Sequence, residues 1–271
     1  MTDKYAVIGN PIAHSKSPLI HQAFAKQCNQ DLLYTAELIP IDGIMQGLEQ
    51  LQAEGFKGIN VTVPFKEKVW QLIDNKSGLA TLAGAINTVT FNSDGSLYGD
   101  NTDGIGLCRD LMDNHGIQLA NKRILLLGAG GAARGVIQPL LKQNPTQLTI
   151  ANRTVSKAQD LVEHFADFGN LNATGFEALS GPFDLIINAT SASLQGVVPP
   201  IPSSTITAHT CCYDMMYSNE DTAFIRWAKQ QHAYKTIDGL GMLIEQAAEA
   251  FALWRVVKPE TQNVIKLIRQ P

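Results

Sequence analysis

One stretch constrains the fold of this chain most, namely residues 123–134, Arg-Ile-Leu-Leu-Leu-Gly-Ala-Gly-Gly-Ala-Ala-Arg. Its uninterrupted apolar start is typical of a strand buried on both faces of a parallel sheet, and the glycine-rich turn that follows opens onto a helix. Gly128 permits a tight turn, Gly130 lets bare backbone approach a pyrophosphate, and Ala133 allows close packing of helix on strand. The stretch therefore predicts a dinucleotide-binding unit. The alternative is an ordinary glycine-rich turn between a strand and a helix.

The residues after the next expected strand, 148–151, indicate which dinucleotide would bind. An NAD site places a carboxylate about 20 residues after the first glycine, where it accepts a hydrogen bond from the ribose 2′-hydroxyl. This chain has Asn152-Arg153-Thr154 there, then Ser156 and Lys157, and no acid before Asp160. A guanidinium, a hydroxyl and an ammonium suit a 2′-phosphate, so we expect NADP. The alternative is a solvated, basic helix start.

Composition and charge limit the classes of partner. The chain has 271 residues, 45% of them hydrophobic and 17% charged, with a net charge of −4. This length suits two ordinary domains, and the charge gives no general attraction to nucleic acid or anionic membranes. The four cysteines show neither a CxxC pair nor zinc-type spacing, so we expect reduced thiols and no metal. With no signal-peptide pattern and no apolar run near the ~20 residues of a membrane span, we expect a cytoplasmic protein.

Strands and helices are expected to alternate along the whole chain. In the first part we expect strands at residues 5–9, 33–39, 58–63, 86–91 and 96–99, and helices at 18–28, 44–53, 65–73 and 105–115. Later we expect strands at 124–127, 148–151, 185–188 and 211–214, and helices at 132–142, 156–165, 222–231 and 241–255. This alternation predicts an α/β protein with a largely parallel sheet in its first part and a Rossmann-like second part.

Two hydroxyl groups follow the first expected strand, at a place where open α/β sheets bind ligands. Ser15 and Ser17 precede a helix that starts with Pro18. For Ser17 alone, simple capping of that helix explains the residue as well as a function does. Ser15 is not needed as a cap, so it favours a loop that presents hydroxyls to a carboxylate.

The third expected strand ends in a second group of polar residues. Strand alternation places Asn60 and Thr62 on one face, and Lys66 follows the proline that ends strand pairing. Lys66 is equally well explained as a surface lysine. Further on, Asp100 or Asp103 is explained either as a cap of the next helix or as a site residue.

Nine short motifs in one order carry a resemblance to a known family. They are HSKSP, NVTVPFK, AGAINT, GDNTDG, LLGAGGAAR, ANRT, NATS, YDMMY and DGLGMLIEQAAEAF. Each motif alone is weak, but in register over nearly the whole chain they make the sequence resemble shikimate dehydrogenase. That family reduces 3-dehydroshikimate to shikimate with NADPH in the aromatic amino-acid (chorismate) pathway.

The resemblance implies a fold and a set of site residues. It implies an α/β substrate domain with a mostly parallel sheet at residues 1–104, completed by 239–271, a Rossmann-like NADP-binding domain at 105–238, and an active-site cleft between them. Lys66 and Asp103 would be the catalytic pair. The substrate, shikimate or 3-dehydroshikimate, would be bound by Ser15, Ser17, Asn60, Thr62, Asn87, Asp103, Tyr217 and Gln246. NADP would be bound by Gly128, Ala129, Gly130, Gly131, Ala132, Asn152, Arg153, Thr154, Lys157, Thr190, Met215 and Gly239. The assembly would be a monomer or a homodimer.

The residue types suit this chemistry. Hydride addition to a ketone builds alkoxide charge, so a cationic acid such as Lys66 would stabilise the transition state and supply the proton. An anion such as Asp103 would orient that ammonium and favour its charged form.

The sequence departs from the family pattern at three positions, and two rival interpretations stay open. Gly78 stands where relatives often carry an acid, Lys157 where some carry Arg, and Ser193 where Gly is frequent. The nearest rival is a quinate/shikimate dehydrogenase that uses NAD, against which residues 152–154 argue. The other is a non-catalytic NADP-binding sensor, against which the presence of both Lys66 and Asp103 argues.

Overall fold

The structure is a computed structural model that describes residues 2–269, and the chain falls into two compact units. Unit 1 runs up to Gly106 and resumes at Leu243, and unit 2 covers Leu107–Met242. Each unit contains a six-stranded sheet, and most strand pairs are parallel. The predicted α/β class with mostly parallel sheets is confirmed, including the Rossmann-like half, whereas the cleft expected between the domains stays a prediction.

The sheet of unit 1 is mixed. Its strands follow the order β2-β1-β3-β5-β6-β4, with bounds β1 Asp3–Gly9, β2 Leu32–Leu38, β3 Phe56–Val61, β4 Asn75–Lys76, β5 Thr88–Phe91 and β6 Leu97–Asp100. β1 pairs in parallel with β2 and β3, whereas β5 runs antiparallel to both β3 and β6. Asn60 on β3 therefore lies opposite Thr88 on β5, and Thr88 lies opposite Asp100 on β6. This register gathers polar side chains at one end of the sheet.

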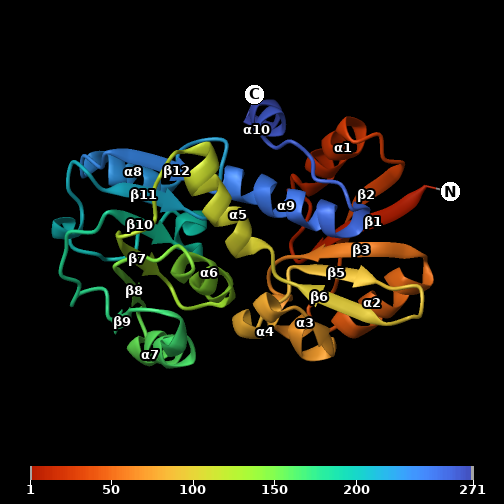
Figure 1. The fold of residues 1–271 in the computed structure, drawn as a ribbon, viewed down its shortest axis with the longest axis horizontal. Coiled ribbons are helices and arrows are strands. Elements are labelled where there is room, and N and C mark those ends of the chain that lie inside the picture. The colour runs from red at the N-terminus through yellow and green to blue at the C-terminus, as the bar shows by residue number, and fades with distance from the viewer. Residues whose placement is uncertain (1, 270–271) are drawn as a thin grey trace. The chain divides into compact units, whose positions relative to one another are not determined.

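Helices cover both faces of this sheet. They are α1 Ser17–Gln27, α2 Ile44–Ala53, α3 Lys66–Leu72, α4 Gly78–Ala83 and the C-terminal helices α9 Leu240–Arg255 and α10 Gln262–Arg269. Along β1, Ala6 and Ile8 join a core with apolar residues of α2 and α3, whereas Tyr5 and Val7 face Trp254 of α9. Figure 1 shows α1 and α9 on one side of the sheet and α2 and α3 on the other.

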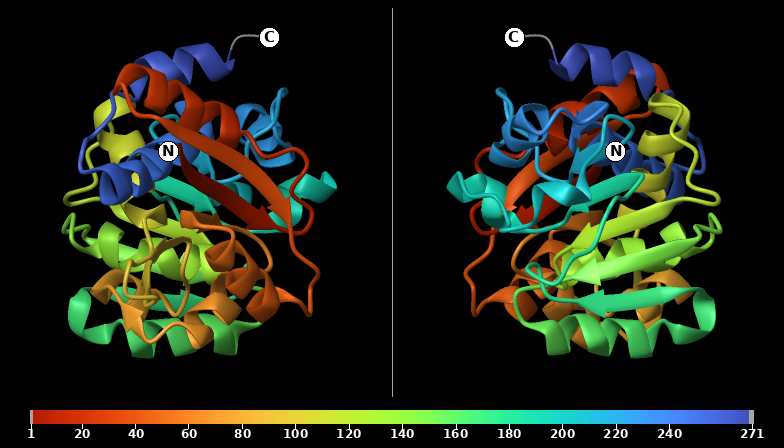
Figure 2. Two further views of the ribbon diagram at one scale, coloured as in Figure 1. Left: turned by 90° about the vertical axis from the view of Figure 1, so that its right-hand side faces the viewer. Right: turned by 90° about the vertical axis from the view of Figure 1, so that its left-hand side faces the viewer.

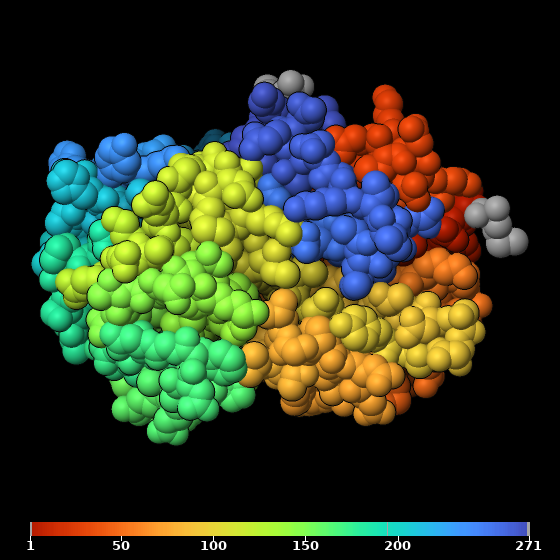
Figure 3. Space-filling view, viewed as in Figure 1, coloured from red at the N-terminus to blue at the C-terminus, as the bar shows by residue number. Residues whose placement is uncertain are grey.

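The C-terminal segment completes unit 1. The ring of Trp254 stacks on Tyr5 with centroids 4.8 Å apart, and its Nε1 donates to the Val89 carbonyl at 3.2 Å. Gly58 makes room for it, because a Cβ at that position would lie 2.4 Å from Trp254 Nε1. Figure 3 shows the blue C-terminal segment packed directly against the red N-terminal segment. Residues from the two ends of the chain therefore share one core.

The sheet of unit 2 is parallel throughout. Its strands follow the order β12-β11-β10-β7-β8-β9, with bounds β7 Arg123–Leu127, β8 Gln147–Ala151, β9 Leu171–Thr174, β10 Leu185–Asn188, β11 Cys211–Asp214 and β12 Lys235–Asp238. The green-to-blue strands in the right panel of Figure 2 form this sheet. The order reverses between β7 and β10, as in a dinucleotide-binding fold.

Helices and short turns connect these strands. The bounds are α5 Asp103–Arg109, continued by a π-helical turn at Asp110–Asn114, then α6 Gly131–Leu141, α7 Val155–His164 and α8 Ala223–Gln230, with 3₁₀ turns at Ala166–Phe168, Ser191–Gln195 and Ser203–Thr205. Phe224 and Ala228 of α8 pack with Leu125 and Leu127 of β7, so α8 covers one face of the sheet.

The expected strands and helices are all present, but the sequence interpretation missed several short ones. It missed β4, α4, β9, β12 and α10. Both β9 and β12 are edge strands of four residues, and Ile237 is the only fully buried residue in either. Such short, half-exposed strands lack the apolar run that marks β7. Within residues 2–269, no helix combines the length and the apolar character that a bilayer crossing requires.

Candidate functional site

Unit 1 contains an ion pair between Lys66 and Asp103. Lys66 begins α3 and Asp103 begins α5. The Lys66 Nζ lies 2.6 Å from Asp103 Oδ2, and the two side chains are only 19% and 7% exposed. A charge-assisted hydrogen bond at this burial is stronger than one in water and fixes both groups. The alternative of Lys66 as a free surface lysine is therefore wrong.

Asn87 holds the second oxygen of the Asp103 carboxylate. Its Nδ2 donates to Asp103 Oδ1 at 2.8 Å and lies 3.1 Å from Gln246 Oε1. The backbone N–H of Thr102 donates to Asn87 Oδ1 at 2.9 Å, so the amide nitrogen, rather than the oxygen, faces the carboxylate. The structure therefore brings together four residues that the resemblance implied, Lys66, Asn87, Asp103 and Gln246.

Asp103 does not cap its own helix. The Asp103 N–H instead donates to Asn101 Oδ1 at 3.1 Å, and Asn101 Nδ2 donates to the Ala85 carbonyl at 3.0 Å. Asp100 accepts from the backbone N–H of Asn101 at 2.7 Å. Asn101 thus accepts from the first N–H of α5, and the Asp103 carboxylate bonds to Lys66 and Asn87.

Asn60 on β3 extends this hydrogen-bond network to Tyr34 on β2 and Thr88 on β5. The Tyr34 hydroxyl donates to Asn60 Oδ1 at 2.7 Å. The Asn60 Nδ2 donates to Thr88 Oγ1 at 3.1 Å and to the Asn87 carbonyl at 3.2 Å. All of these groups are buried, so polar partners are required. The sequence interpretation named Asn60 but missed Tyr34 and Thr88.

The loop after β1 supplies two hydroxyl groups, and Thr62, the residue directly after β3, supplies a third. Ser17 is the first residue of α1, whose cap position is Lys16, and the Ser17 N–H is accepted by Ser15 Oγ at 3.3 Å. The alternative that Ser17 only caps α1 is therefore wrong, whereas the binding of a carboxylate by Ser15 and Ser17 stays a prediction. Thr62 lies against Gly9 at the end of β1, where a Cβ would come within 2.6 Å of Thr62 Cγ2. Since β1 and β3 are neighbours, the hydroxyls of Ser15, Ser17 and Thr62 follow adjacent strand ends.

These groups offer two kinds of chemistry in unit 1. The Lys66–Asp103 pair combines a proton donor with an anion that holds it in place, as general acid–base catalysis of carbonyl reduction requires. Neutral hydroxyls and amides recognise a polyhydroxy carboxylate by hydrogen bonds, and each such bond is lost with an analogue that lacks the matching group.

Unit 2 contains the expected glycine turn. Gly128 has a φ of +107°, which L side chains rarely adopt, and its N–H donates to the Ala151 carbonyl at 2.8 Å. A Cβ at Gly130 would meet nothing within 4 Å, so the space beside the turn is open. The α6 helix starts at Gly131 with no side-chain cap and no acid in its first turn. Its first N–H groups therefore remain free for an anion, and the residues Gly128, Ala129, Gly130, Gly131 and Ala132 fit a pyrophosphate.

The start of α7 is basic and exposed. Asn152 Nδ2 donates to the Thr154 carbonyl at 2.8 Å and shapes the turn after β8. Arg153, Thr154 and Lys157 are exposed, and the first turn of α7 contains no acid. Among the described residues, neither Arg153 nor Lys157 forms an ion pair. These donors fit the 2′-phosphate of NADP.

The buried carboxylate of Asp214 accepts hydrogen bonds from residues at the ends of both β10 and β11. Asp214 is fully buried and accepts from Asn188 Nδ2 at 3.0 Å, from Thr222 Oγ1 at 2.5 Å and from the Met216 N–H at 3.1 Å. Burial raises the pKa of Asp214, and these donors partly offset that effect. Asn188 Oδ1 in turn accepts from Thr190 Oγ1 at 2.7 Å. The position of Thr190 therefore depends on Asp214.

Met215 and Gly239 lie next to each other at the ends of β11 and β12. A Cβ at Gly239 would lie 2.2 Å from the Met215 carbonyl oxygen, so only glycine fits there without a shift of backbone. Thr190, Met215 and Gly239 thus follow three successive strand ends of the sheet. Tyr217 is half-buried beyond β11 in the same unit, and its part in substrate binding stays a prediction.

Ser193 and Gly78, two positions that depart from the family pattern, have clear local environments. Ser193 is buried and accepts from Asn188 Nδ2 at 3.2 Å. Gly78 follows Ser77, which caps α4 by accepting from the Ala80 N–H at 3.0 Å, and a Cβ at Gly78 would meet nothing within 4 Å. Neither residue disturbs the networks described above.

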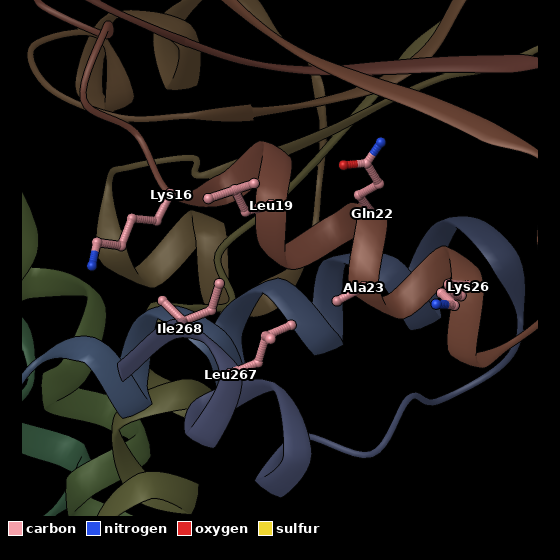
Figure 4. A pocket seen from close by; sticks show the side chains of 7 residues that line it. All are labelled: Lys16, Leu19, Gln22, Ala23, Lys26, Leu267 and Ile268. Carbon is pink, nitrogen blue, oxygen red and sulfur yellow. The ribbon is translucent and has the colours of Figure 1, made fainter. Parts of the chain in front are cut away.

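Elsewhere in unit 1 a groove runs between α1 and α10 (Figure 4). It is lined by Lys16, Leu19, Gln22, Ala23, Lys26, Leu267 and Ile268. None of the residues expected to bind substrate lines it. Within the described part of the chain, no group of three or more His, Cys, Asp or Glu side chains could hold a metal ion, and all four cysteines are free thiols.

Comparison with known families gives three matches in sequence. Residues 7–89 match the shikimate dehydrogenase substrate binding domain, residues 110–198 match shikimate / quinate 5-dehydrogenase, and residues 239–269 match the shikimate 5′-dehydrogenase C-terminal domain. Together the matched segments cover most of the chain.

Individual proteins show the same similarity over the full length. The shikimate dehydrogenase (NADP(+)) of Hahella chejuensis is 54% identical over 268 residues, which is 99% of either chain. The structure of an Ael1 enzyme from Pseudomonas putida matches with a TM-score of 0.94 at 45% identity, over 100% of this chain and 99% of that one. The shikimate 5-dehydrogenase from Thermus thermophilus, in complex with NADP(H) and shikimate, matches with a TM-score of 0.86 at 30% identity over 99% of both chains.

Proposed function

The chain belongs to the shikimate dehydrogenase family, and from this premise we propose how its residues carry out the reaction. It is an NADP-dependent oxidoreductase that acts on a CH–OH group and catalyses the reversible reduction of 3-dehydroshikimate to shikimate in aromatic amino-acid (chorismate) biosynthesis. The observation that carries the residue assignment is the shielded Lys66–Asp103 pair, joined through Asn87 to Gln246.

We assign cofactor binding to unit 2. The backbone of residues 128–132 binds the pyrophosphate, because the first turn of α6 lacks both a cap and an acid. Asn152, Arg153, Thr154 and Lys157 bind the 2′-phosphate side. Thr190, Met215 and Gly239 line the nicotinamide side. When bound, NADPH supplies a hydride to the carbonyl carbon of the substrate.

We assign substrate binding mainly to unit 1. The hydroxyls of Ser15, Ser17 and Thr62 bind the substrate carboxylate, with Tyr217 as a further donor. The ring hydroxyls are held by Asn60, Asn87, Asp103 and Gln246. These are neutral groups apart from Asp103, so selectivity comes from matched hydrogen bonds. An analogue that lacks one hydroxyl leaves a buried partner unpaired, which costs about 1–3 kcal/mol.

Lys66 is the general acid of ketone reduction. As the new C–H bond forms, the carbonyl π electrons move onto oxygen, and that oxygen takes a proton from the Lys66 ammonium. In the reverse direction neutral Lys66 accepts the alcohol proton. Asp103 holds the lysine nitrogen at 2.6 Å and accepts a hydrogen bond from a substrate hydroxyl.

A spectrophotometric assay tests the function directly. Shikimate and quinate, each with NADP⁺ or NAD⁺, are mixed with the enzyme at alkaline pH, and formation of reduced cofactor is followed by absorbance. We expect shikimate-dependent reduction of NADP⁺. A preference for NAD⁺ or quinate would favour the quinate-type rival, and no turnover even at high enzyme concentration would favour the non-catalytic sensor.

The Lys66→Met substitution tests the catalytic assignment. We expect kcat to fall by ~10²–10⁴-fold, the usual contribution of a general acid, whereas NADPH binding and thermal unfolding should change little. Lys68→Met is the matched control, because Lys68 is exposed on the same helix. Near-normal turnover of Lys66→Met would refute the assignment.

We also propose a cellular location and an oligomeric state for the enzyme. A biosynthetic enzyme that consumes NADPH works where that cofactor is made, so we place the protein in the cytoplasm. Its partner is the small-molecule substrate, and a net charge of −4 gives no general attraction to nucleic acid or to anionic membranes. The assembly is a monomer or a homodimer, which light scattering at the enzyme's working concentration distinguishes.

A further inference from the structure

One buried hydroxyl next to the catalytic network has no part in the assignments above. Thr88 is the first residue of β5 and is 0% exposed. Its Oγ1 lies 3.1 Å from Asn60 Nδ2, 2.8 Å from Asn87 Oδ1 and 3.5 Å from Thr102 Oγ1. It therefore sits between two amides that are proposed to bind substrate.

The amide of Asn60 has a fixed orientation. The backbone carbonyl of Asn87 accepts only, so the Asn60 atom 3.2 Å from it must be the nitrogen. On the other side of the amide, the Tyr34 hydroxyl oxygen lies 2.7 Å from Asn60 Oδ1. Burial raises the pKa of Tyr34 well above its ordinary value, so the phenol keeps its proton and donates it. Asn60 therefore turns its nitrogen to Thr88.

The hydroxyl proton of Thr88 has one good acceptor. An amide N–H only donates, so the Thr88 oxygen accepts from Asn60 and its own hydrogen must point elsewhere. The nearest acceptor is Asn87 Oδ1 at 2.8 Å, well within the usual range for O–H···O bonds. The other oxygen in reach, Thr102 Oγ1, lies at 3.5 Å. The Thr88 proton therefore points to Asn87.

The amide of Asn87 is the last step before the catalytic pair. Its oxygen accepts from the Thr88 hydroxyl and from the Thr102 N–H, so its nitrogen faces Asp103 Oδ1. If this amide turned over, its oxygen would face the carboxylate, and the two would repel. All donors along the path from Tyr34 through Asn60, Thr88 and Asn87 thus point the same way, toward Asp103.

We propose that Thr88 is a positioning residue for the reaction, because its hydroxyl fixes the Asn87 amide in the orientation that holds Asp103, and with it Lys66, in place. Thr88 acts through Asn87 and contacts neither substrate nor cofactor. Tyr34 sets the direction of the same path at its far end. This inference rests on the proposed function, since it assigns a role within the same reaction.

The Thr88→Val substitution removes the hydroxyl and keeps the shape. Asn87 Oδ1 loses its shortest donor and keeps the N–H and the more distant hydroxyl of Thr102, at 2.9 and 3.2 Å. Asn60 Nδ2 loses one of its two acceptors and keeps the Asn87 carbonyl. We expect kcat to fall on the order of 10-fold, the equivalent of about 1.4 kcal/mol. The KM for shikimate and the affinity for NADP⁺ should change less, and the pH profile of kcat should change, because the catalytic pair is held less firmly.

Two controls separate positioning from a merely structural role. Thr88→Ser keeps the hydroxyl, so we expect it to restore most of kcat and the wild-type pH profile. Thr90→Val makes the same change two residues along β5, at a buried hydroxyl for which the described residues offer no hydrogen-bond partner, and it should leave kcat and the pH profile unchanged. Thermal unfolding of all three variants shows whether the fold is intact.

The outcomes decide between the inference and the proposed function. If wild type does not oxidise shikimate, the proposed function fails. If wild type is active but Thr88→Val stays within about twofold of its kcat, or Thr88→Ser is as impaired as Thr88→Val, the inference fails.

The Tyr34→Phe substitution provides a second test, and it decides alone if the Thr88→Val variant does not fold. We expect it to lower kcat, and to add little to the effect of Thr88→Val because both act on one path. A Tyr34→Phe enzyme with wild-type kcat, or fully additive effects, would overturn the inference.

Discussion

The most quantitative prediction concerns the buried ring of His21 on α1. His21 is 1% exposed and stacks on Tyr34 with centroids 4.0 Å apart and planes at 5°. The rings of Phe24, Phe251 and Trp254 complete its surroundings. Burial lowers the pKa of His21 from 6.5 to about 3 and outweighs the nearby Asn60 side chain, which acts in the opposite direction. The folded protein therefore holds this imidazole neutral.

The pKa of His21 determines the sign and size of a pH effect on stability. Below pH 6.5 the unfolded chain binds a proton at this position and the folded protein does not, so stability is present above the unfolded pKa and is lost as pH falls toward the folded pKa of about 3. Between about pH 7.5 and about pH 5 this single group should lower the free energy of unfolding by about 2 kcal/mol.

The His21→Phe substitution tests this prediction. It keeps an aromatic ring against Tyr34 and removes the titration, so the variant should lose about 2 kcal/mol less stability than wild type over the same pH range. Urea unfolding followed by tryptophan fluorescence measures this in a Trp227→Phe background, where the remaining indoles, Trp70 and Trp254, both lie in unit 1.

His14→Phe is the control, because it changes the exposed histidine of the same unit. This control should keep the wild-type dependence on pH. Equal losses of stability in wild type and His21→Phe would refute the reasoning, since they would show that the folded protein protonates His21 as readily as the unfolded chain does.

Two further predictions concern unit 2. Arg153→Ala should raise the Kd for NADPH by roughly 10- to 100-fold, because loss of charged hydrogen bonds costs about 1.5–3 kcal/mol, and it should leave NADH binding unchanged. The control Lys142→Ala, at the C-terminal end of α6, should change the Kd of neither cofactor. Equal effects of Arg153→Ala on both cofactors would contradict the 2′-phosphate assignment. Gly239→Ala should lower the free energy of unfolding by ~1–3 kcal/mol, because the new Cβ would lie 2.2 Å from the Met215 carbonyl oxygen. An unchanged Tm in differential scanning calorimetry would contradict this, because it would show that the backbone at Met215 and Gly239 moves apart at little cost.

The sequence was sufficient to predict most of the fold because its central strands are apolar on both faces. Residues 124–127 are wholly buried, which explains why an unbroken apolar run identified β7. The edge strands β9 and β12 have no such run, since most of their residues are half-exposed. The π-helical turn at Asp110–Asn114 likewise has no sequence signal that distinguishes it from the α-helix before it.

The candidate site was predicted less completely, for a reason of geometry. Lys66, Asn87, Asp103 and Gln246 were named through the family resemblance, and the structure places them in one network. Thr88 belongs to the same AGAINT segment but was not singled out, because its importance depends on the register that sets it opposite Asn60. Tyr34 lies on β2, far from any of the nine motifs, and no local pattern marks it.

The sequence left open whether Ser17 only caps α1 or belongs to the site, and the structure excludes the capping alternative by a shift of one residue. That alternative assumed Pro18 at the first helical position, which proline prefers. In the structure α1 begins one residue earlier, so the Ser17 N–H needs an acceptor, which Ser15 Oγ provides. Helix ends shift by such small steps because a proline fits both the first and the second position of a helix.

The discontinuous make-up of unit 1 has a consequence for biosynthesis of the chain. All of unit 2 lies between the two segments of unit 1, and Trp254 fills space against Tyr5 and Gly58. While the protein is being translated, unit 2 therefore has all its residues before unit 1 does. Until α9 leaves the ribosome, α1 alone covers that side of the sheet in unit 1, so a nascent chain stalled before residue 243 exposes aromatic residues such as Tyr5, to which chaperones can bind.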